Sequence, residues 1–162
     1  MCGKETSALE YADARMFDQS PFVLVELKNS DKKSLQLAET LVNCIGAIPF
    51  PLDAKTHDQW VAYTSHFPYL LSNLLARITP PETKPLAASG WRSSSRLAGS
   101  SIPMMNDILR TNKEEVLRVL DQFMMQMNEV RSVIEKTPDS INDYLKVGQT
   151  SYLEMVTDNE AH

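Results

Sequence analysis

The sequence predicts a mainly helical protein that begins with one strand–helix–strand (βαβ) unit. Two observations predict this fold class. Two extended, apolar stretches lie in the first third of the chain, at residues 22–27 and 47–52, with a helical stretch between them. From Asp53 onward, apolar residues recur at steps of three and four, the spacing of one helix face. We therefore expect two parts, residues 1–52 and 53–162.

The first stretch, Phe-Val-Leu-Val-Glu-Leu at residues 22–27, barely alternates between apolar and polar side chains. This pattern is typical of a strand that is buried on both faces of a parallel sheet. Asp31 is expected to cap a helix that runs to about Cys44, and Gly46 to end it in the left-handed conformation. Two parallel strands leave their outer edges unpaired, so we expect this unit to pair with a partner chain or to belong to a larger sheet.

The next predicted helix carries an apolar face from residue 60 to residue 78. Pro68 lies inside this pattern, removes one backbone donor and predicts a kink that frees the carbonyl of Thr64. Residues 82–101 are rich in Ser, Gly, Ala and Pro. They are expected to form a loop, or a loop with a short helix.

A long helix is predicted after Asn112, because Asn112 followed three residues later by Glu115 has the pattern of a helix cap. Pro138 is expected to end this helix, and residues 140–155 to form the last one. Apolar residues within the long helix step by 4, 3, 4, 3 and 4, which is suited to a helix–helix interface. This seam consists of Val116, Leu120, Phe123, Met127, Val130 and Ile134.

Composition excludes several classes of protein. The net charge of −5 and the pI of about 5.2 argue against non-specific binding to nucleic acid, which relies on clustered positive charge. Cys2 and Cys44 form no metal-ligand spacing. No basic-then-apolar signal segment opens the sequence, and no apolar run reaches 18 residues. We expect a cytoplasmic protein with no membrane contact.

The first candidate functional feature is a stripe of Ala62, His66, Tyr69 and Asn73 beside the apolar helix face. One interpretation is a partly exposed histidine on a helix flank. The other is a ligand-facing stripe at the kink, where an imidazole meets bent backbone. His57 and His66 are nine positions apart and face opposite ways on a straight helix, so they are poor candidates for a shared metal site.

The second candidate is the segment Ser-Gly-Trp-Arg-Ser-Ser-Ser-Arg at residues 89–96. Arg92 and Arg96, four residues apart and flanked by hydroxyls, could clamp a carboxylate or phosphate through paired hydrogen bonds. The alternative is a solvated loop with surface ion pairs. The sequence contains no Walker loop and no GxGxxG, GxSxG or HExxH motif.

Two segments carry a resemblance to a known family. DAKTHDQWVAYTSHFPYLLSNLLA and SGWRSSSRLAGSSIPMMNDILRTNKEEVL resemble the helical C-terminal domain of prephenate and arogenate dehydrogenases. The family's pattern there is His-Asp, then Ser-His-Leu-Pro-His, then Gly-Phe-Arg-Asp-x-Thr-Arg, then a tryptophan and a long dimer helix. The opening MCGKETSALEYADARMF is similar to the stretch after the family's His-Pro-Met-x-Gly motif.

The resemblance implies a fold for both parts. Residues 53–162 would form a helical substrate-binding and dimerisation domain of the 6-phosphogluconate-dehydrogenase-like C-terminal type. Residues 1–52 would be the C-terminal remnant of a nucleotide-binding α/β domain, a βαβ piece of a Rossmann sheet.

The resemblance also implies a substrate-binding site. Arg96 matches the arginine that holds a substrate carboxylate, and Arg92 corresponds to a basic position that reaches the pocket, of the same or the neighbouring subunit. Tyr69 stands where the family often has a second substrate-binding histidine. Ser93 replaces the usual aspartate, and Met105 replaces the tryptophan. The full implied set is Arg96, His66, Ser65, Tyr69, Arg92, Gly90 and Glu5, with His57 and Asp58 matching the family's His-Asp.

The complete family enzyme oxidatively decarboxylates prephenate or arogenate with NAD or NADP, on the route to tyrosine. This sequence holds neither the GxGxxG loop nor the family's catalytic His-Pro histidine. We therefore assign it no catalytic or metal-binding residue and expect it to bind no cofactor alone. It is expected to contribute carboxylate binding and to form a homodimer. The alternatives are a non-catalytic regulatory subunit that pairs with a separate nucleotide-binding chain, or a truncated product. The sequence does not determine whether the substrate is prephenate or arogenate, or whether the cofactor is NAD or NADP.

Overall fold

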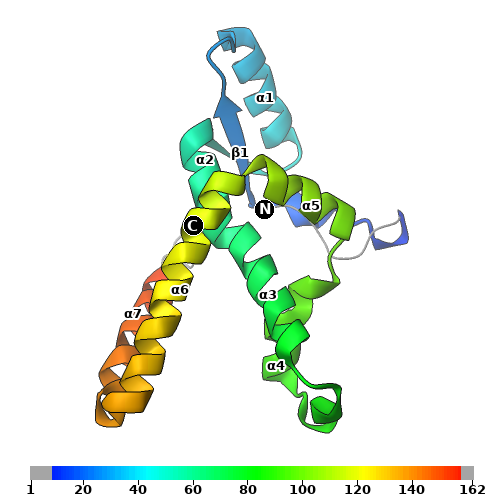
Figure 1. Cartoon of the computed structure of the whole chain (residues 1–162). Coiled ribbons are helices and arrows are strands. Elements are labelled where there is room, and N and C mark those ends of the chain that lie inside the picture. Colours follow the sequence, from blue (N-terminus) through cyan, green and yellow to red (C-terminus); the bar gives the residue numbers. More distant parts are fainter. Residues whose placement is uncertain (1–8, 158–162) are drawn as a thin grey trace. The chain divides into compact units, whose positions relative to one another are not determined.

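The computed structural model describes residues 9–157, which form two compact units that divide after Leu117 (Figure 1). The first unit contains a two-stranded parallel sheet and most of the helices, and the second contains most of one long helix and the last helix. The predicted fold class is confirmed. None of the described helices is long and apolar enough to span a membrane.

The βαβ unit consists of β1 (Pro21–Glu26), α1 (Lys32–Cys44) and β2 (Ile48–Asp53). The strands pair in parallel, with Pro21 opposite Ile48. Each strand lies within one residue of its predicted position. The central residues of β1 are only half-buried. The sequence predicts a strand that is buried on both faces. The described residues do not bury β1 to that extent.

Both ends of α1 form as predicted. The Asp31 carboxylate accepts hydrogen bonds from the backbone N–H groups of Lys33 and Ser34. Beyond the other end, Gly46 has a φ of +78°, in the left-handed region. A Cβ at Gly46 would lie 3.3 Å from Oδ1 of Asp18, so both backbone conformation and space favour glycine.

The two prolines of β2 determine which of its edges can pair. Backbone groups of alternate residues point to opposite edges of a strand. The N–H of Ile48 donates to the carbonyl of Ser20 at 2.9 Å, so Ile48 and every second residue after it face β1. The backbone nitrogens of Pro49 and Pro51 therefore face the outer edge, and they carry no hydrogen to donate. A further strand at that edge would lack two donors.

The opposite edge of the sheet belongs to β1 and carries the backbone groups of Val23 and Val25. Within residues 9–157, β1 pairs with β2 alone, so these groups have no strand partner there. The β1 edge lacks one donor, at Pro21 where the strand begins, whereas the β2 edge lacks two, so a further strand can be bonded more completely on the β1 side.

A π turn lies just before Pro68, where the sequence predicts a kink. The chain runs through α2 (Ala54–Val61), the π turn η3 (Ala62–His66) and α3 (Phe67–Ile78) without a loop. The bond that closes the π turn spans five residues, where an α-helix spans four. Pro68 is the second residue of α3, the helix directly after this turn, and supplies no N–H to the backbone bonding there.

The Ser- and Pro-rich segment that follows contains more helix than predicted. It forms η4 (Pro81–Leu86), α4 (Ser89–Ser95) and η5 (Arg96–Gly99), and α5 (Ile102–Thr111) begins soon after. Both α4 and η5 pack against α3, and α4 and α3 lie side by side (Figure 1).

The long helix starts after Asn112, as predicted, and the Asn112 carbonyl accepts its first backbone bond from Val116, but the backbone of Asn112 is not that of a capping residue. The helix α6 (Lys113–Lys136) follows Asn112 directly. Asn112 has φ −111° and ψ 34°, whereas a residue that caps a helix start is extended. Its amide nitrogen instead donates to the carbonyl of Asp58, and the Glu115 carboxylate accepts a bond from Gln59.

The second unit contains the remainder of α6, a short turn η6 (Pro138–Ser140) and α7 (Ile141–Thr157). The helix α6 ends at Lys136, two residues before Pro138, as predicted. The Tyr144 hydroxyl of α7 lies 3.4 Å from the Gln126 carbonyl oxygen and 3.2 Å from its Oε1. These contacts join the two helices of the unit.

Replacing Gly46 by alanine should lower the free energy of unfolding by about 1–2 kcal/mol, because a Cβ disfavours the left-handed conformation. Gly46→Asn should lower the free energy of unfolding by less, because asparagine adopts the left-handed conformation more readily than alanine. Urea denaturation of the full chain and both variants measures the difference. Equal stability of Gly46→Ala and the unchanged chain would contradict this account.

Candidate functional site

The centre of the candidate site is His66, the last residue of the π turn. Its side chain is nearly inaccessible: the residue is 7% exposed, its stripe neighbour Ala62 is 0% exposed and Tyr69 is 9% exposed. The stripe therefore faces the interior of the first unit. The interpretation of His66 as a partly exposed histidine on a helix flank is wrong.

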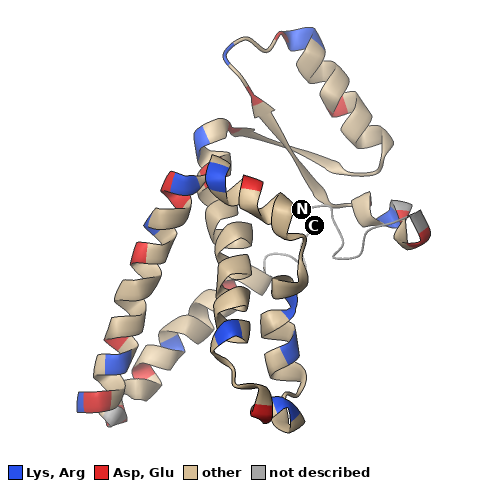
Figure 2. Cartoon of the chain, turned by 45° about the vertical axis from the view of Figure 1, so that its right-hand side comes forward, with Lys and Arg blue, Asp and Glu red and all other residues tan. Residues whose placement is uncertain are grey.

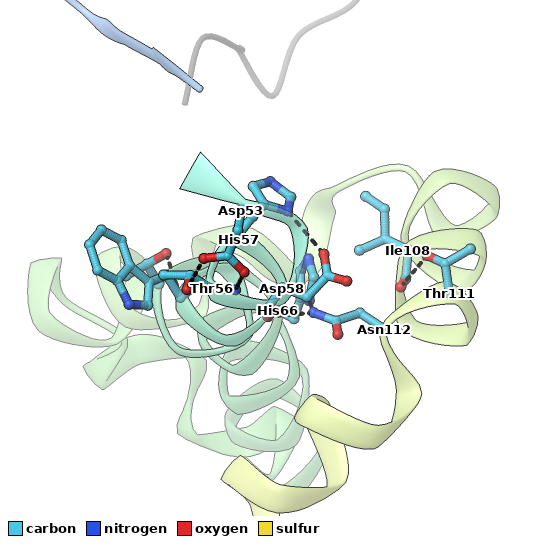
Figure 3. A network of polar contacts seen from close by, with 10 residues as sticks. Asp53, Thr56, His57, Asp58, His66, Ile108, Thr111 and Asn112 are labelled. Atoms are coloured by element: carbon cyan, nitrogen blue, oxygen red, sulfur yellow. Dashed lines mark hydrogen bonds and ion pairs between the residues drawn. The ribbon is translucent and has the colours of Figure 1, made fainter. Parts of the chain in front are cut away.

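A polar network surrounds the ring (Figure 3). Nδ2 of Asn112 donates to the backbone oxygen of Asp58 at 2.7 Å and lies 3.3 Å from Nδ1 of His66. Nδ1 of His57 lies 2.9 Å from Oδ1 of Asp58. A straight helix would place the two histidines on opposite faces. Here Asp58 and Asn112 link them into one network.

The sequence does not mark Asn112 as a site residue, because its spacing to Glu115 predicts a helix cap. Asn112 is 8% exposed, so its amide is placed against α2 and η3 and not in solvent. A second bond, 3.4 Å from Nε2 of Gln59 to Oε1 of Glu115, also joins α2 to the first turn of α6. The start of α6 is thereby held beside the π turn.

Burial lowers the pKa of His66 below the ordinary imidazole value of 6.5. The nearby Asp58 carboxylate acts in the opposite direction and raises it, while His57 lowers it. Burial is the largest cause, so the ring is neutral at pH 7.

The arginine segment is anchored to α3 by two hydrogen bonds. The Ser72 hydroxyl donates to the Ser94 carbonyl at 2.7 Å, and Nε1 of Trp91 donates to the Thr79 hydroxyl at 2.9 Å. Ser72 is 3% exposed, so its bond is shielded from water. These bonds fix α4 and the start of η5 relative to the helix that follows His66.

The two arginines lie one helical turn apart on this anchored segment. Arg92 is in the last turn of α4, and its Nε donates to the Ala87 carbonyl at 3.1 Å. Arg96 begins η5. Both are exposed. Figure 2 shows basic residues on this segment beside α3, which itself is almost uncharged.

Ser65 and Gly90, two further implied residues, lie in the same two segments. Ser65 is half-buried next to His66 in the π turn. Gly90 is in the first turn of α4, where a Cβ would meet nothing within 4 Å, so packing does not require glycine there. The Ser93 hydroxyl donates to the Gly90 carbonyl at 3.1 Å. Glu5 lies outside the described residues.

The described residues do not fit a dinucleotide cofactor. A pyrophosphate binds to the free N–H groups where a strand leads into a helix. At both such junctions a carboxylate already occupies that place: Asp31 accepts from the start of α1, and Asp53 accepts from the N–H and hydroxyl of Thr56. These bonds lower the pKa of both carboxyls, which keeps them charged.

Two surface depressions also carry the wrong charge for an anion. One is at the carboxyl ends of the strands, and the other is beside α2 and the start of α6. Glu26, Asp53 and Lys28 contribute the charges of the first. The second is lined by Lys55, Asp58, Thr111, Asn112, Glu114 and Glu115. In each, carboxylates outnumber ammonium groups. Among residues 9–157, no group of three or more His, Cys, Asp or Glu side chains could hold a metal ion.

We expect the His66 ring to titrate below pH 6.5, and we expect Asp58→Asn to lower its pKa further. With the folded pKa lowered, the unfolded chain binds more protons between that pKa and 6.5. The free energy of unfolding should therefore fall as the pH falls through this window. NMR titration of the ring in both proteins measures the pKa. A midpoint at or above 6.5 in the unchanged chain would refute the assignment.

Comparison with known proteins places this geometry in a family. Residues 53–147 match the family described as "Prephenate dehydrogenase, dimerization domain". The chain is 27% identical over 142 residues to prephenate dehydrogenase of Bacillus subtilis (strain 168), covering 84% of this chain and 38% of that protein. It is 31% identical to prephenate dehydrogenase of Lactococcus lactis subsp. cremoris, with the same coverage of 84% and 38%.

Solved structures share the fold. A prephenate dehydrogenase from Aquifex aeolicus, in complex with hydroxyphenyl propionate and NAD+, has a TM-score of 0.84 at 24% identity, covering 96% of this chain and 57% of that one. Synechocystis arogenate dehydrogenase has a TM-score of 0.77 at 21% identity, covering 95% and 59%.

The chain spans 38% of the length of the Bacillus and Lactococcus relatives. The matched residues, 53–147, make up more than half of its 162 residues and include the π turn, the arginine segment and the first turns of the last helix. The chain belongs to the prephenate dehydrogenase family, of which it contains the dimerization domain.

Proposed function

We propose that this chain forms the substrate-carboxylate-binding and dimerising C-terminal part of a prephenate or arogenate dehydrogenase. The observation that carries the proposal is the position of the two candidate segments. The π turn with its neutral, buried His66 leads directly into α3, and the segment with Arg92 and Arg96 is anchored to that same helix.

The residue types suit a small carboxylate with further oxygen atoms. Arg96 would hold the carboxylate through two parallel hydrogen bonds, and Arg92 would add positive charge. The Ser65 hydroxyl and the His66 ring, both in the π turn, and the Tyr69 phenol in the first turn of α3 would offer short-range hydrogen bonds. Gly90 and Glu5 complete the proposed set by resemblance to the family.

The cofactor would come with the nucleotide-binding portion of the family. Three observations support this. The described strand–helix junctions do not fit a pyrophosphate. The Bacillus and Lactococcus relatives are more than twice the length that the chain spans, and the Aquifex relative was solved in complex with NAD+. We propose that this portion adds its next strand to the open edge of β1. The 162 residues alone would not transfer hydride.

Arg96→Ala should weaken binding of prephenate to the full chain by roughly 10- to 100-fold, because a bond to a charged group contributes about 1.5–3 kcal/mol. Isothermal titration calorimetry measures the dissociation constants. Arg15→Ala is the matched control, because the Arg15 side chain is 88% exposed and pairs locally with Asp13. Equal binding by the Arg96 variant and the unchanged chain would remove Arg96 from the site, and no binding by either would overturn the proposal.

The seam of α6 supports association of two copies. Its first residue, Val116, is 6% exposed, but Met127 is 51% exposed and Ile134 is 60% exposed. Neighbouring α7 also exposes large apolar side chains, including Leu145 at 59% and Tyr152 at 63%. Apolar surface of this extent marks an interface, and the matched family is a dimerization domain. We propose a homodimer that covers these side chains.

Ile134→Lys should weaken the dimer by roughly 10- to 100-fold, since burying such a side chain contributes about 1.5–3 kcal/mol. Sedimentation velocity across micromolar concentrations measures the dissociation constant. Leu37→Lys is the control, because Leu37 is 61% exposed but lies in α1, outside the matched residues. A monomeric unchanged chain, or an unaffected Ile134 variant, would contradict the proposed interface.

A further inference from the structure

The orientation of the Asn112 side-chain amide is fixed by its partner. The atom 2.7 Å from the backbone oxygen of Asp58 is Nδ2. A carbonyl oxygen only accepts hydrogen bonds, so the opposite orientation would place two oxygens in contact. The amide group that faces α2 is therefore the NH2 group.

The same nitrogen lies 3.3 Å from Nδ1 of His66. An NH2 group has two hydrogens and no acceptor capacity. One hydrogen serves the Asp58 carbonyl, so the other points to the ring, and Nδ1 must accept it. A neutral imidazole carries its proton on the nitrogen that is not accepting, which here is Nε2.

The surroundings of His66 favour this state over a charged ring. Its burial opposes a positive charge, and a charged ring would bring a proton on Nδ1 against the Asn112 donor. The nearest carboxylate, Asp58, is engaged with His57 at 2.9 Å. The hydrogen bonds of the described residues thus engage Nδ1, and Nε2 remains available for a ligand.

We propose that Asn112 is a positioning residue that holds His66 in the Nε2–H tautomer, so that His66 donates a hydrogen bond to an oxygen of the bound carboxylate substrate and does not act as a base. The role toward the ligand rests on the proposed function, whereas the tautomer itself does not. The carboxylate substrate would therefore accept a hydrogen bond from Nε2 of His66, as it would from the guanidinium of Arg96.

Long-range 1H–15N NMR of the full chain tests the tautomer directly, because it shows which ring nitrogen carries the proton. The unchanged chain should show the proton on Nε2 at pH 7.5. A proton on Nδ1 in this spectrum would overturn the proposal with no variant needed.

Two variants test whether Asn112 sets this state. Asn112→Asp places an acceptor against Nδ1, so the proton should move to Nδ1 and the ring pKa should rise. Asn112→Ala removes the donor and should give a mixture of both tautomers. Asn106→Ala is the matched control, because Asn106 is an exposed asparagine on α5, the helix that ends directly before Asn112. An unchanged His66 spectrum in a folded Asn112→Ala protein, with thermal unfolding as the check on folding, would remove Asn112 from this role.

Titration with hydroxyphenyl propionate separates the tautomer from the proposed function. Binding should shift the Nε2–H signal of His66, and Asn112→Asp should weaken the affinity at least tenfold while Asn106→Ala leaves it unchanged. If Nε2 carries the proton but its signal does not respond to bound ligand, the donor role is refuted while the carboxylate site stands. If no ligand binds, the proposed function fails and the tautomer assignment survives.

Discussion

The missing N–H of Pro68 is the constraint on which the candidate site depends. An α-helix cannot continue through this residue with all its backbone bonds, and the chain responds with one wider turn from Ala62 to His66. That turn sends His66 into the interior of the unit, against α5. There the ring meets the side chain of Asn112. A single residue without a donor thus determines where the imidazole lies and what it contacts.

In the first unit, the carboxylates described above and the two arginines of the candidate site lie on different segments. Anionic carboxylates occupy the starts of α1 and α2 and line the surface depressions, while positive charge is placed on the segment anchored to α3. A carboxylate ligand is repelled from the former and attracted to the latter. Burial keeps the His66 ring neutral, so in the proposed site it would act through the direction of its hydrogen bond and not through charge.

Residues whose effect is local were predictable from the sequence. Asp31 and Gly46 act on the backbone next to them, and both ends of α1 were predicted correctly. Pro68 predicts a kink, but the periodicity of apolar residues does not reveal a turn widened by one residue, so the sequence does not predict the π turn. Asn112 was misjudged for a related reason. Its partners lie 54 and 46 residues away, and spacing along the chain carries no information about them.

The prolines of β2 have a consequence for how copies of this chain can meet. An exposed strand edge is a template on which other chains can stack, and it is a common origin of aggregation. Pro49 and Pro51 remove the donors from one edge, so two copies cannot join their sheets there with full bonding. Pairing of sheet edges between copies is therefore restricted to the edge of β1, and a neighbouring strand that covers this edge would prevent such stacking.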